Sequence, residues 1–233
     1  MKLTERQEKI LDIIVREYVN SAQPVSSKLL EKKYDFDISP ATIRIEMQKL
    51  TDKGFLSQPH TSAGRVPTDN GYRFFVNNLM EQKNRNVDEV GDWLKEDIED
   101  TFKFIQSLTK HIAEATRALT LSYLEDENLF WTEGWEEVLK EPEFEERDFL
   151  LRFTNFLKNF EENIEELKPD SDINVYIGKE NLVPKAKDFT VISSRYHLPS
   201  GEKGIISILG PKRMEYDKNI SLINSLKELL DNF

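Results

Sequence analysis

The sequence has no cysteine and only three histidines, His60, His111 and His197, in 233 residues. Without cysteine there can be no disulfides, thiolate metal sites or cysteine nucleophiles, which fits a reducing cytosol. The histidines lie far apart in the sequence, so they do not predict a histidine-based metal or catalytic cluster. Adjacent acids such as Glu136 and Glu137 point apart on a helix and make a poor acid–base pair. We therefore predict no catalytic residue, no metal site and no cofactor.

Long apolar runs are also missing. No stretch approaches the roughly 20 apolar residues that span a bilayer. The first ten residues, MKLTERQEKI, have neither the apolar core nor the cleavage site of a signal peptide. We therefore expect a cytoplasmic protein without a membrane partner. The 38% of hydrophobic and 10% of aromatic residues indicate a globular chain and argue against disorder.

The net charge of −11 is unevenly distributed along the chain. Residues 1–80 carry a net charge of +2, residues 81–172 carry −15 and residues 173–233 carry +2. Phosphate contact depends on the local field, so the acidic middle block does not exclude a DNA-binding module at either end.

Residues 1–80 show the pattern of three helices followed by a two-stranded flap. Helices are expected over 4–20, capped by Thr4, then from Pro24 to Lys33, and from Pro40 to a stop at Gly54. Two short extended segments then flank a loop rich in Pro, Ser and Gly, and a further helix begins near Asp69. This order predicts a winged helix-turn-helix that binds double-stranded DNA. A protein-docking or dimer platform is the alternative.

The third helix and the flap supply most of the candidate DNA contacts. Ile43, Met47 and Leu50 form the inward stripe of the helix, so its opposite face and its N-terminal end are expected to meet the DNA. Arg65 is predicted either to contact DNA or only to attach the flap to the helix at Tyr72. The predicted contacts are Ser27, Lys28, Ser39, Thr42, Arg44, Ile45, Gln48, Lys49, His60, Thr61, Ser62 and Arg65.

Residues 81–127 change character and form an acidic stretch with apolar residues at helical spacing. The stripe is predicted either as the seam of a homodimer or as a cover on a sheet within one chain. The predicted seam residues are Leu94, Ile98, Phe102, Ile105, Leu108 and Ile112.

The remaining residues, 128–233, predict a small sheet backed by helices. A short strand, a turn at Gly134 and a helical run with a phenylalanine stripe come first, and the stripe is expected in the core. Three β-branched runs follow, and the last two form a hairpin before a closing helix. The expected fold is α+β, with a DNA-binding domain at 1–80, a helical connector at 81–127 and a regulatory domain at 128–233.

Several strings of the sequence resemble the family of the heat-inducible transcription repressor HrcA. They are ERQEKILDIIVREYVNSAQPVSSKLL (5–30), SPATIRIEM (39–47), QPHTSAGRVPTDNGYRFFV (58–76), LFWTEGWEEVLKEPEF (129–144), VYIGKEN (175–181) and ISSRYHLPSGEKGIISILGPKRMEYDKNISLI (192–223). The resemblance implies a homodimer that represses chaperone operons of the groE and dnaK type by binding an inverted-repeat operator called CIRCE. It also implies a GAF-like C-terminal part with an inserted dimerisation domain, and an activity that the GroE chaperonin modulates.

The chain departs from this family pattern in two places. It is shorter than family members, and the missing stretch falls near residues 122–128, so a reduced GAF-like sheet is expected. The usual Arg-Asn step of the recognition helix is Arg44-Ile45, and Ile45 could meet a thymine methyl. The alternative functions are a metabolite-responsive repressor with a ligand in its C-terminal domain, an enzyme, and an interaction protein that does not bind DNA.

Overall fold

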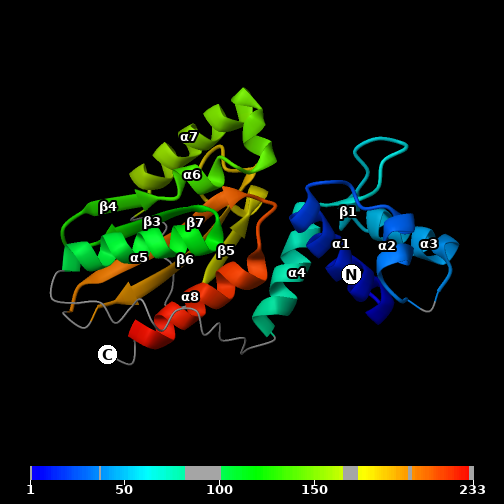
Figure 1. The fold of residues 1–233 in the computed structure, drawn as a ribbon, viewed down its shortest axis with the longest axis horizontal. Helices are drawn as coiled ribbons and strands as arrows, with labels where there is room; N and C mark the ends of the chain where they lie inside the picture. The colour runs from blue at the N-terminus through cyan, green and yellow to red at the C-terminus, as the bar shows by residue number, and fades with distance from the viewer. Residues whose placement is uncertain (1, 37, 82–100, 165–172, 199–200, 231–233) are drawn as a thin grey trace. The chain divides into compact units, whose positions relative to one another are not determined.

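The structure of the chain is a computed structural model that describes residues 2–36, 38–81, 101–164, 173–198 and 201–230. It divides into two compact units, Met1–Lys83 and Asn84–Phe233, which are described separately (Figure 1). Within the described ranges, no helix combines the length and the apolar character needed to cross a bilayer.

The first unit has three helices, a two-stranded antiparallel sheet and a fourth helix. Its elements are α1 (Glu5–Ser21), α2 (Ser27–Lys33), α3 (Pro40–Asp52), β1 (Leu56–Ser57), β2 (Val66–Pro67) and α4 (Asp69–Glu81). The capping box at Thr4 is confirmed, because Thr4 Oγ1 accepts from the Gln7 amide and the Gln7 side chain accepts from the Thr4 amide. The predicted start of α2 at Pro24 is wrong, since Ser26 caps a helix that begins at Ser27.

The helices of the first unit pack through the stripes that their spacing predicts. A helix repeats every 3.6 residues, so apolar side chains three and four apart share one face. The side chains with no measurable exposure in this core include Ile10, Leu11, Ile14, Leu30, Ile43, Leu50 and Val76.

The second unit contains a five-stranded antiparallel sheet with the order β4-β3-β7-β6-β5. Its strands are β3 (Leu119–Leu124), β4 (Leu129–Glu133), β5 (Asn174–Ile177), β6 (Phe189–His197) and β7 (Lys203–Pro211). Its helical elements are α5 (Thr101–Thr116), α6 (Trp135–Val138), η3 (Pro142–Glu145), α7 (Arg147–Glu162), η4 (Gly178–Glu180) and α8 (Tyr216–Leu230). The predicted hairpin is confirmed as β6 and β7, paired from Phe189↔Pro211 to His197↔Lys203. The fold class α+β is confirmed.

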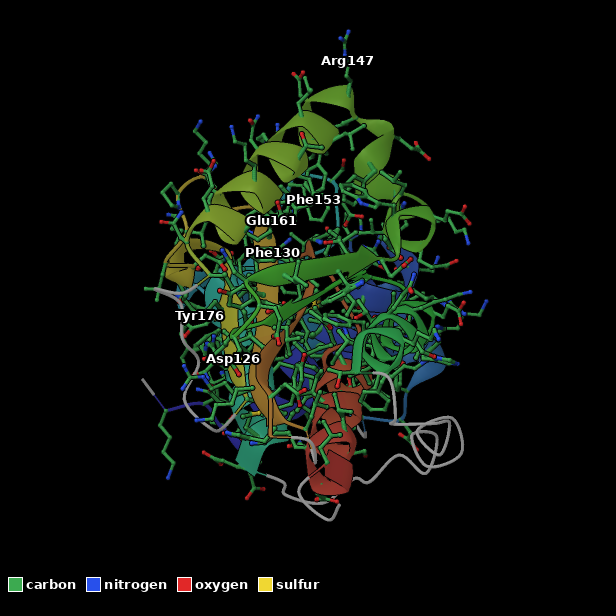
Figure 2. The ribbon with its side chains drawn as sticks, turned by 90° about the vertical axis from the view of Figure 1, so that its left-hand side faces the viewer. Asp126, Phe130, Arg147, Phe153, Glu161 and Tyr176 are labelled. Atoms are coloured by element: carbon green, nitrogen blue, oxygen red, sulfur yellow. The ribbon has the colours of Figure 1, made fainter. Side chains whose placement is uncertain are left out.

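Helices cover both faces of the sheet. Phe153 of α7 points toward the strands, whereas Arg147 at the start of that helix points away (Figure 2). On the other face, Thr109 of α5 donates to Ser122 of β3 at 2.7 Å. Likewise, the hydroxyls of Thr190 in β6 and Tyr216 in α8 are 2.9 Å apart. The phenylalanine stripe of α7 therefore lies in the core, as its spacing predicted.

Strand β3 was not predicted from the sequence, because residues 81–127 were assigned to a helical connector. All six of its side chains are buried, since α7 covers one face and α5 the other. Its sequence, LTLSYL, alternates apolar and polar residues as a strand does, but it was included in the helical stretch of residues 81–127. The predicted boundary between 127 and 128 falls in the turn from β3 to β4, so residues 101–124 belong to the second unit.

The prediction of a helical dimer seam is wrong for three of its residues, which are buried within one chain. Ile105, Leu108 and Ile112 are fully or almost fully buried within one chain. They therefore cover the sheet, which was the alternative interpretation of this stripe. Phe102 is 47% exposed and contacts Trp131 of β4, with ring centroids 5.9 Å apart. Leu94 and Ile98 lie outside the described residues.

Phe153→Ala tests the core between α7 and the sheet. Phe153 is fully buried among aromatic rings, so its truncation should lower the free energy of unfolding by about 3–5 kcal/mol. Urea denaturation followed by tryptophan fluorescence measures the loss, because Trp135 contacts Phe153. Leu151→Ala on the exposed side of α7 is the matched control and should change stability by less than about 0.5 kcal/mol. Equal losses in both variants would contradict this packing.

Candidate nucleic-acid interface

Helix α3 presents one face to solvent and the other to the core. Ile43, Met47 and Leu50 are buried, as predicted. The exposed positions of the helix are Pro40, Ala41, Arg44, Ile45, Gln48, Lys49 and Asp52. Hence the structure brings four of the predicted contact residues, Arg44, Ile45, Gln48 and Lys49, onto one exposed helix face.

A buried carboxylate holds α3 against α1. Glu46 accepts from Gln7 Nε2 and from Lys49 Nζ, each at 2.9 Å, and Lys53 Nζ donates to Gln7 Oε1 at 2.8 Å. The hydrogen bonds from Lys49 and Gln7 lower the pKa of Glu46, although burial opposes them. Lys49 is therefore partly committed to the protein itself, which the sequence pattern did not reveal.

The start of α3 is fixed by its cap. Ser39 Oγ accepts from the Thr42 amide at 3.2 Å and lies 3.0 Å from the Thr42 hydroxyl.

In α2, Lys28 is exposed but Ser27 is buried, so the prediction that the Ser27 side chain contacts DNA is wrong. Ser27 is the first residue of α2, and the helix turns its small side chain inward.

The loop between β1 and β2 is held by the side chain of Gln58. Gln58 Nε2 donates to the carbonyl oxygens of Thr61 and Ala63, both at 2.9 Å. The side chains of His60, Thr61 and Ser62 are exposed at its tip. Gln58 was not among the predicted site residues.

The returning segment of the loop is pinned to the residue before the α2 cap. Val25 and Arg65 exchange two backbone hydrogen bonds, of 2.9 and 2.8 Å, as an isolated antiparallel bridge. A Cβ on Gly64 would lie 2.3 Å from the Val25 carbonyl oxygen, which is far inside van der Waals contact. Only glycine permits this approach. The sequence pattern did not identify Val25 as part of the loop.

Arg65 joins the loop to α3. Its Nε donates to Thr51 Oγ1 at 3.0 Å, and its Nη2 donates to Gln48 Oε1 at 2.8 Å. Gln48 in turn donates from Nε2 to Asp52 at 2.8 Å. Arg65 therefore attaches the loop to a helix, as the alternative interpretation predicted, but the helix is α3 and not the one that carries Tyr72.

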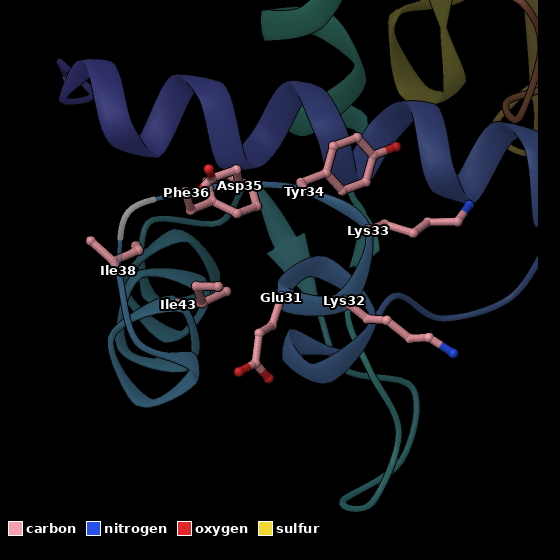
Figure 3. A pocket seen from close by; sticks show the side chains of 8 residues that line it. All are labelled: Glu31, Lys32, Lys33, Tyr34, Asp35, Phe36, Ile38 and Ile43. Carbon is pink, nitrogen blue, oxygen red and sulfur yellow. The ribbon is translucent and has the colours of Figure 1, made fainter.

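The segment between α2 and α3 is tied to α1 by a second buried carboxylate. Glu17 accepts from the Tyr34 hydroxyl at 2.5 Å and from Lys33 Nζ at 2.9 and 3.0 Å. The hydrogen bond to Glu17 and burial together raise the pKa of Tyr34 to about 12. Figure 3 shows the hollow beside this segment, lined by Glu31, Lys32, Lys33, Tyr34, Asp35, Phe36, Ile38 and Ile43. These bonds fix the turn that sets α3 relative to α2.

No group of three or more His, Asp or Glu side chains in the described ranges is arranged to hold a metal ion.

Comparisons with known proteins point to one family. The profile of a family described as "HrcA protein C terminal domain" matches residues 72–220. The heat-inducible transcription repressor HrcA of Natranaerobius thermophilus is 27% identical over 99% of this chain and 98% of its own length. That of Thermoanaerobacter sp. strain X514 is 28% identical over 100% of this chain and 97% of its own length. Both alignments exceed 330 positions, so these relatives carry a long stretch with no counterpart in the 233 residues.

A shorter match and a solved structure complete the comparison. The heat-inducible transcription repressor HrcA of Alkaliphilus metalliredigens is 44% identical over 120 residues, which are 52% of this chain and 35% of the relative. A crystal structure described as that of a hypothetical protein has a TM-score of 0.83, and the match covers 99% of this chain and 98% of the other. Its sequence identity is 22%, so this likeness shows the fold alone.

Gly64→Ala tests the anchoring of the loop. The added Cβ would collide with the Val25 carbonyl, so we expect the bridge to open and the free energy of unfolding to fall by about 1–3 kcal/mol. Hydrogen exchange of the Val25 and Arg65 amides should accelerate in the same variant. Ala63→Ser, one residue away, is the control and should keep both quantities close to wild type. Unchanged amide exchange in Gly64→Ala would contradict the anchoring role.

Proposed function

The chain belongs to the HrcA family, and on this premise we propose that it is a DNA-binding transcriptional repressor and not an enzyme. The observation that carries the proposal is the exposed face of α3 with the β1–β2 loop hydrogen-bonded beside it through Arg65. The printed names of the relatives, heat-inducible transcription repressors, favour the same function.

The first unit has the element order of a winged helix-turn-helix, with α3 as its recognition helix and the β1–β2 loop as its wing. Such a helix lies in the major groove with its N-terminal residues at the base edges. Arg44 and Ile45 occupy that end of α3 on the exposed face, and Ser39 and Thr42 form its cap. Exposed Lys28 and the wing tip at residues 60–62 would meet the phosphate backbone or the minor groove.

We further propose the finer features that the family resemblance implies. The chain acts as a homodimer on an inverted-repeat operator of the CIRCE type, upstream of chaperone operons, and the GroE chaperonin modulates its activity. The second unit serves as a reduced GAF-like regulatory domain. A two-fold operator is matched by two equivalent recognition helices, which supports the dimer on symmetry grounds.

Footprinting with purified protein upstream of the chaperonin genes of the source organism tests this function. Protection of an inverted repeat at stated salt, tightened by added chaperonin, is the expected result. A gel shift that shows no preference for this region over random DNA would contradict the specific repressor, and an unaltered footprint with chaperonin would contradict the modulation.

Arg44→Ala should separate base recognition from general DNA attraction. Arg44 makes no ion pair or hydrogen bond to another described side chain, so its loss leaves the fold intact. A bidentate contact to a base would make the loss about 1–3 kcal/mol on the operator, with a smaller loss on random DNA. Fluorescence anisotropy over a salt series measures both affinities.

The matched control is Arg16→Ala. Arg16 lies on α1, pairs with Asp12 at 2.9 Å and has its guanidinium 5.0 Å from the Phe75 ring, away from the α3 face. Its removal should leave operator affinity unchanged. If Arg44→Ala weakens operator and random DNA equally, Arg44 contacts phosphate rather than a base.

Phe102→Glu tests the dimer after the correction of the helical seam. Phe102 is the predicted seam residue that remains exposed in the described part of α5, so a charge there is tolerated by the fold but opposes an apolar contact between chains. Sedimentation should show a folded monomer with weaker operator binding. Leu182→Glu, at a 68% exposed leucine of the same unit, is the control and should remain dimeric. A folded Phe102→Glu dimer would exclude Phe102 from the interface.

A further inference from the structure

Ile45 is an apolar side chain in the centre of a polar surface. It is 55% exposed, more than any other large hydrophobic residue in the described part of the first unit. Scattered exposed apolar residues are normal, so exposure alone does not suggest a role. What distinguishes Ile45 is its place on the exposed face of α3, next to Arg44 and three residues before Gln48.

The polar neighbours of Ile45 on α3 are already occupied. The Gln48 amide accepts from Arg65 and donates to Asp52, so both of its ends are used. Recognition of adenine by glutamine uses the amide oxygen and one N–H, so in Gln48 it would have to share the amide with Arg65 and Asp52. Lys49 pairs with Glu46 at 2.9 Å. Arg44 and Ile45 are thus the two large exposed side chains of this face that the fold leaves uncommitted.

An isoleucine side chain can contribute only an apolar contact. Among the base edges of the major groove, the apolar group is the C5 methyl of a pyrimidine, which belongs to thymine or to 5-methylcytosine. Arginine reads guanine through O6 and N7. Adjacent residues of a recognition helix can contact adjacent base pairs, so the two side chains would read a short step together.

We propose that Ile45 is a specificity-determining residue that packs on the C5 methyl of a thymine, beside a guanine read by Arg44. The proposal rests on the DNA-binding function proposed above. It explains how a recognition helix without an amide or a charge at this position can still discriminate between base pairs. It also predicts that the hydrogen bond from Arg65 to Gln48 is retained when the protein binds DNA.

The test uses the full chain and synthetic duplexes that contain the footprinted inverted repeat. Each thymine of the half-site is replaced in turn by uracil, which removes only the methyl group. Wild-type protein should lose about fourfold in affinity at one thymine, the factor given by one buried methyl-sized group. Ile45→Ala should bind the thymine and uracil duplexes equally at that position. Ile45→Val should retain part of the discrimination.

Met80→Ala is the matched control, because Met80 is also an exposed large hydrophobic residue in the described part of the first unit, 37% exposed and on α4. It should discriminate between thymine and uracil like wild type. Thermal denaturation checks that Ile45→Ala folds normally, as expected for an exposed position.

The possible outcomes separate this proposal from the function on which it rests. Specific binding without a thymine-to-uracil effect at any position overturns the methyl contact and leaves the repressor function standing. A uracil effect that persists in Ile45→Ala also overturns it. Tighter binding to 5-methylcytosine than to thymine at that position would overturn thymine as the source of the methyl. If no duplex is bound specifically, the proposed function itself fails.

Discussion

The first unit depends on the contact between the backbones of Gly64 and Val25. Their approach leaves no room for a Cβ at position 64, and it allows Val25 and Arg65 to exchange two backbone hydrogen bonds. The returning segment of the β1–β2 loop is thereby held against the segment that enters α2. From this position the Arg65 side chain reaches Thr51 and Gln48 of α3. One close backbone contact thus sets the β1–β2 loop beside α3.

Two buried carboxylates add further bonds that position α3 in the first unit. Glu46 and Glu17 accept several hydrogen bonds each and fix α3 and the preceding turn to α1. Side chains that are already ordered lose less conformational entropy on binding, which favours affinity. For the proposed DNA-binding function, the bonds of Gln48 to Arg65 and Asp52 favour base contacts by the N-terminal half of α3.

Much of this fold could be predicted from local sequence patterns. The caps at Thr4 and Ser39, the stripe of α3 and the β6–β7 hairpin depend on neighbouring residues, and each is found in the structure. The Val25–Arg65 bridge joins residues 40 positions apart, so no local pattern predicts it. Strand β3 was missed although LTLSYL alternates apolar and polar residues, because it was assigned to the preceding helical stretch. The bridge depends on a tertiary contact, so it leaves no periodic pattern in a single sequence. The stripe of α5 was recognised as apolar, but periodicity cannot say whether a sheet or a second chain covers it.

The distribution of charge explains how an acidic protein could approach DNA. The net charge of −11 arises from residues 81–172, whereas residues 1–80 carry +2. Within the first unit, several carboxylates are also neutralised locally, as Glu17 pairs with Lys33, Glu46 with Lys49 and Asp12 with Arg16. The field at the α3 face is therefore set mainly by nearby groups such as Arg44, because charges beyond about 8–10 Å are screened at physiological salt. The net charge of the whole chain is thus a poor guide to its partner, and the local pairing of carboxylates is a better one.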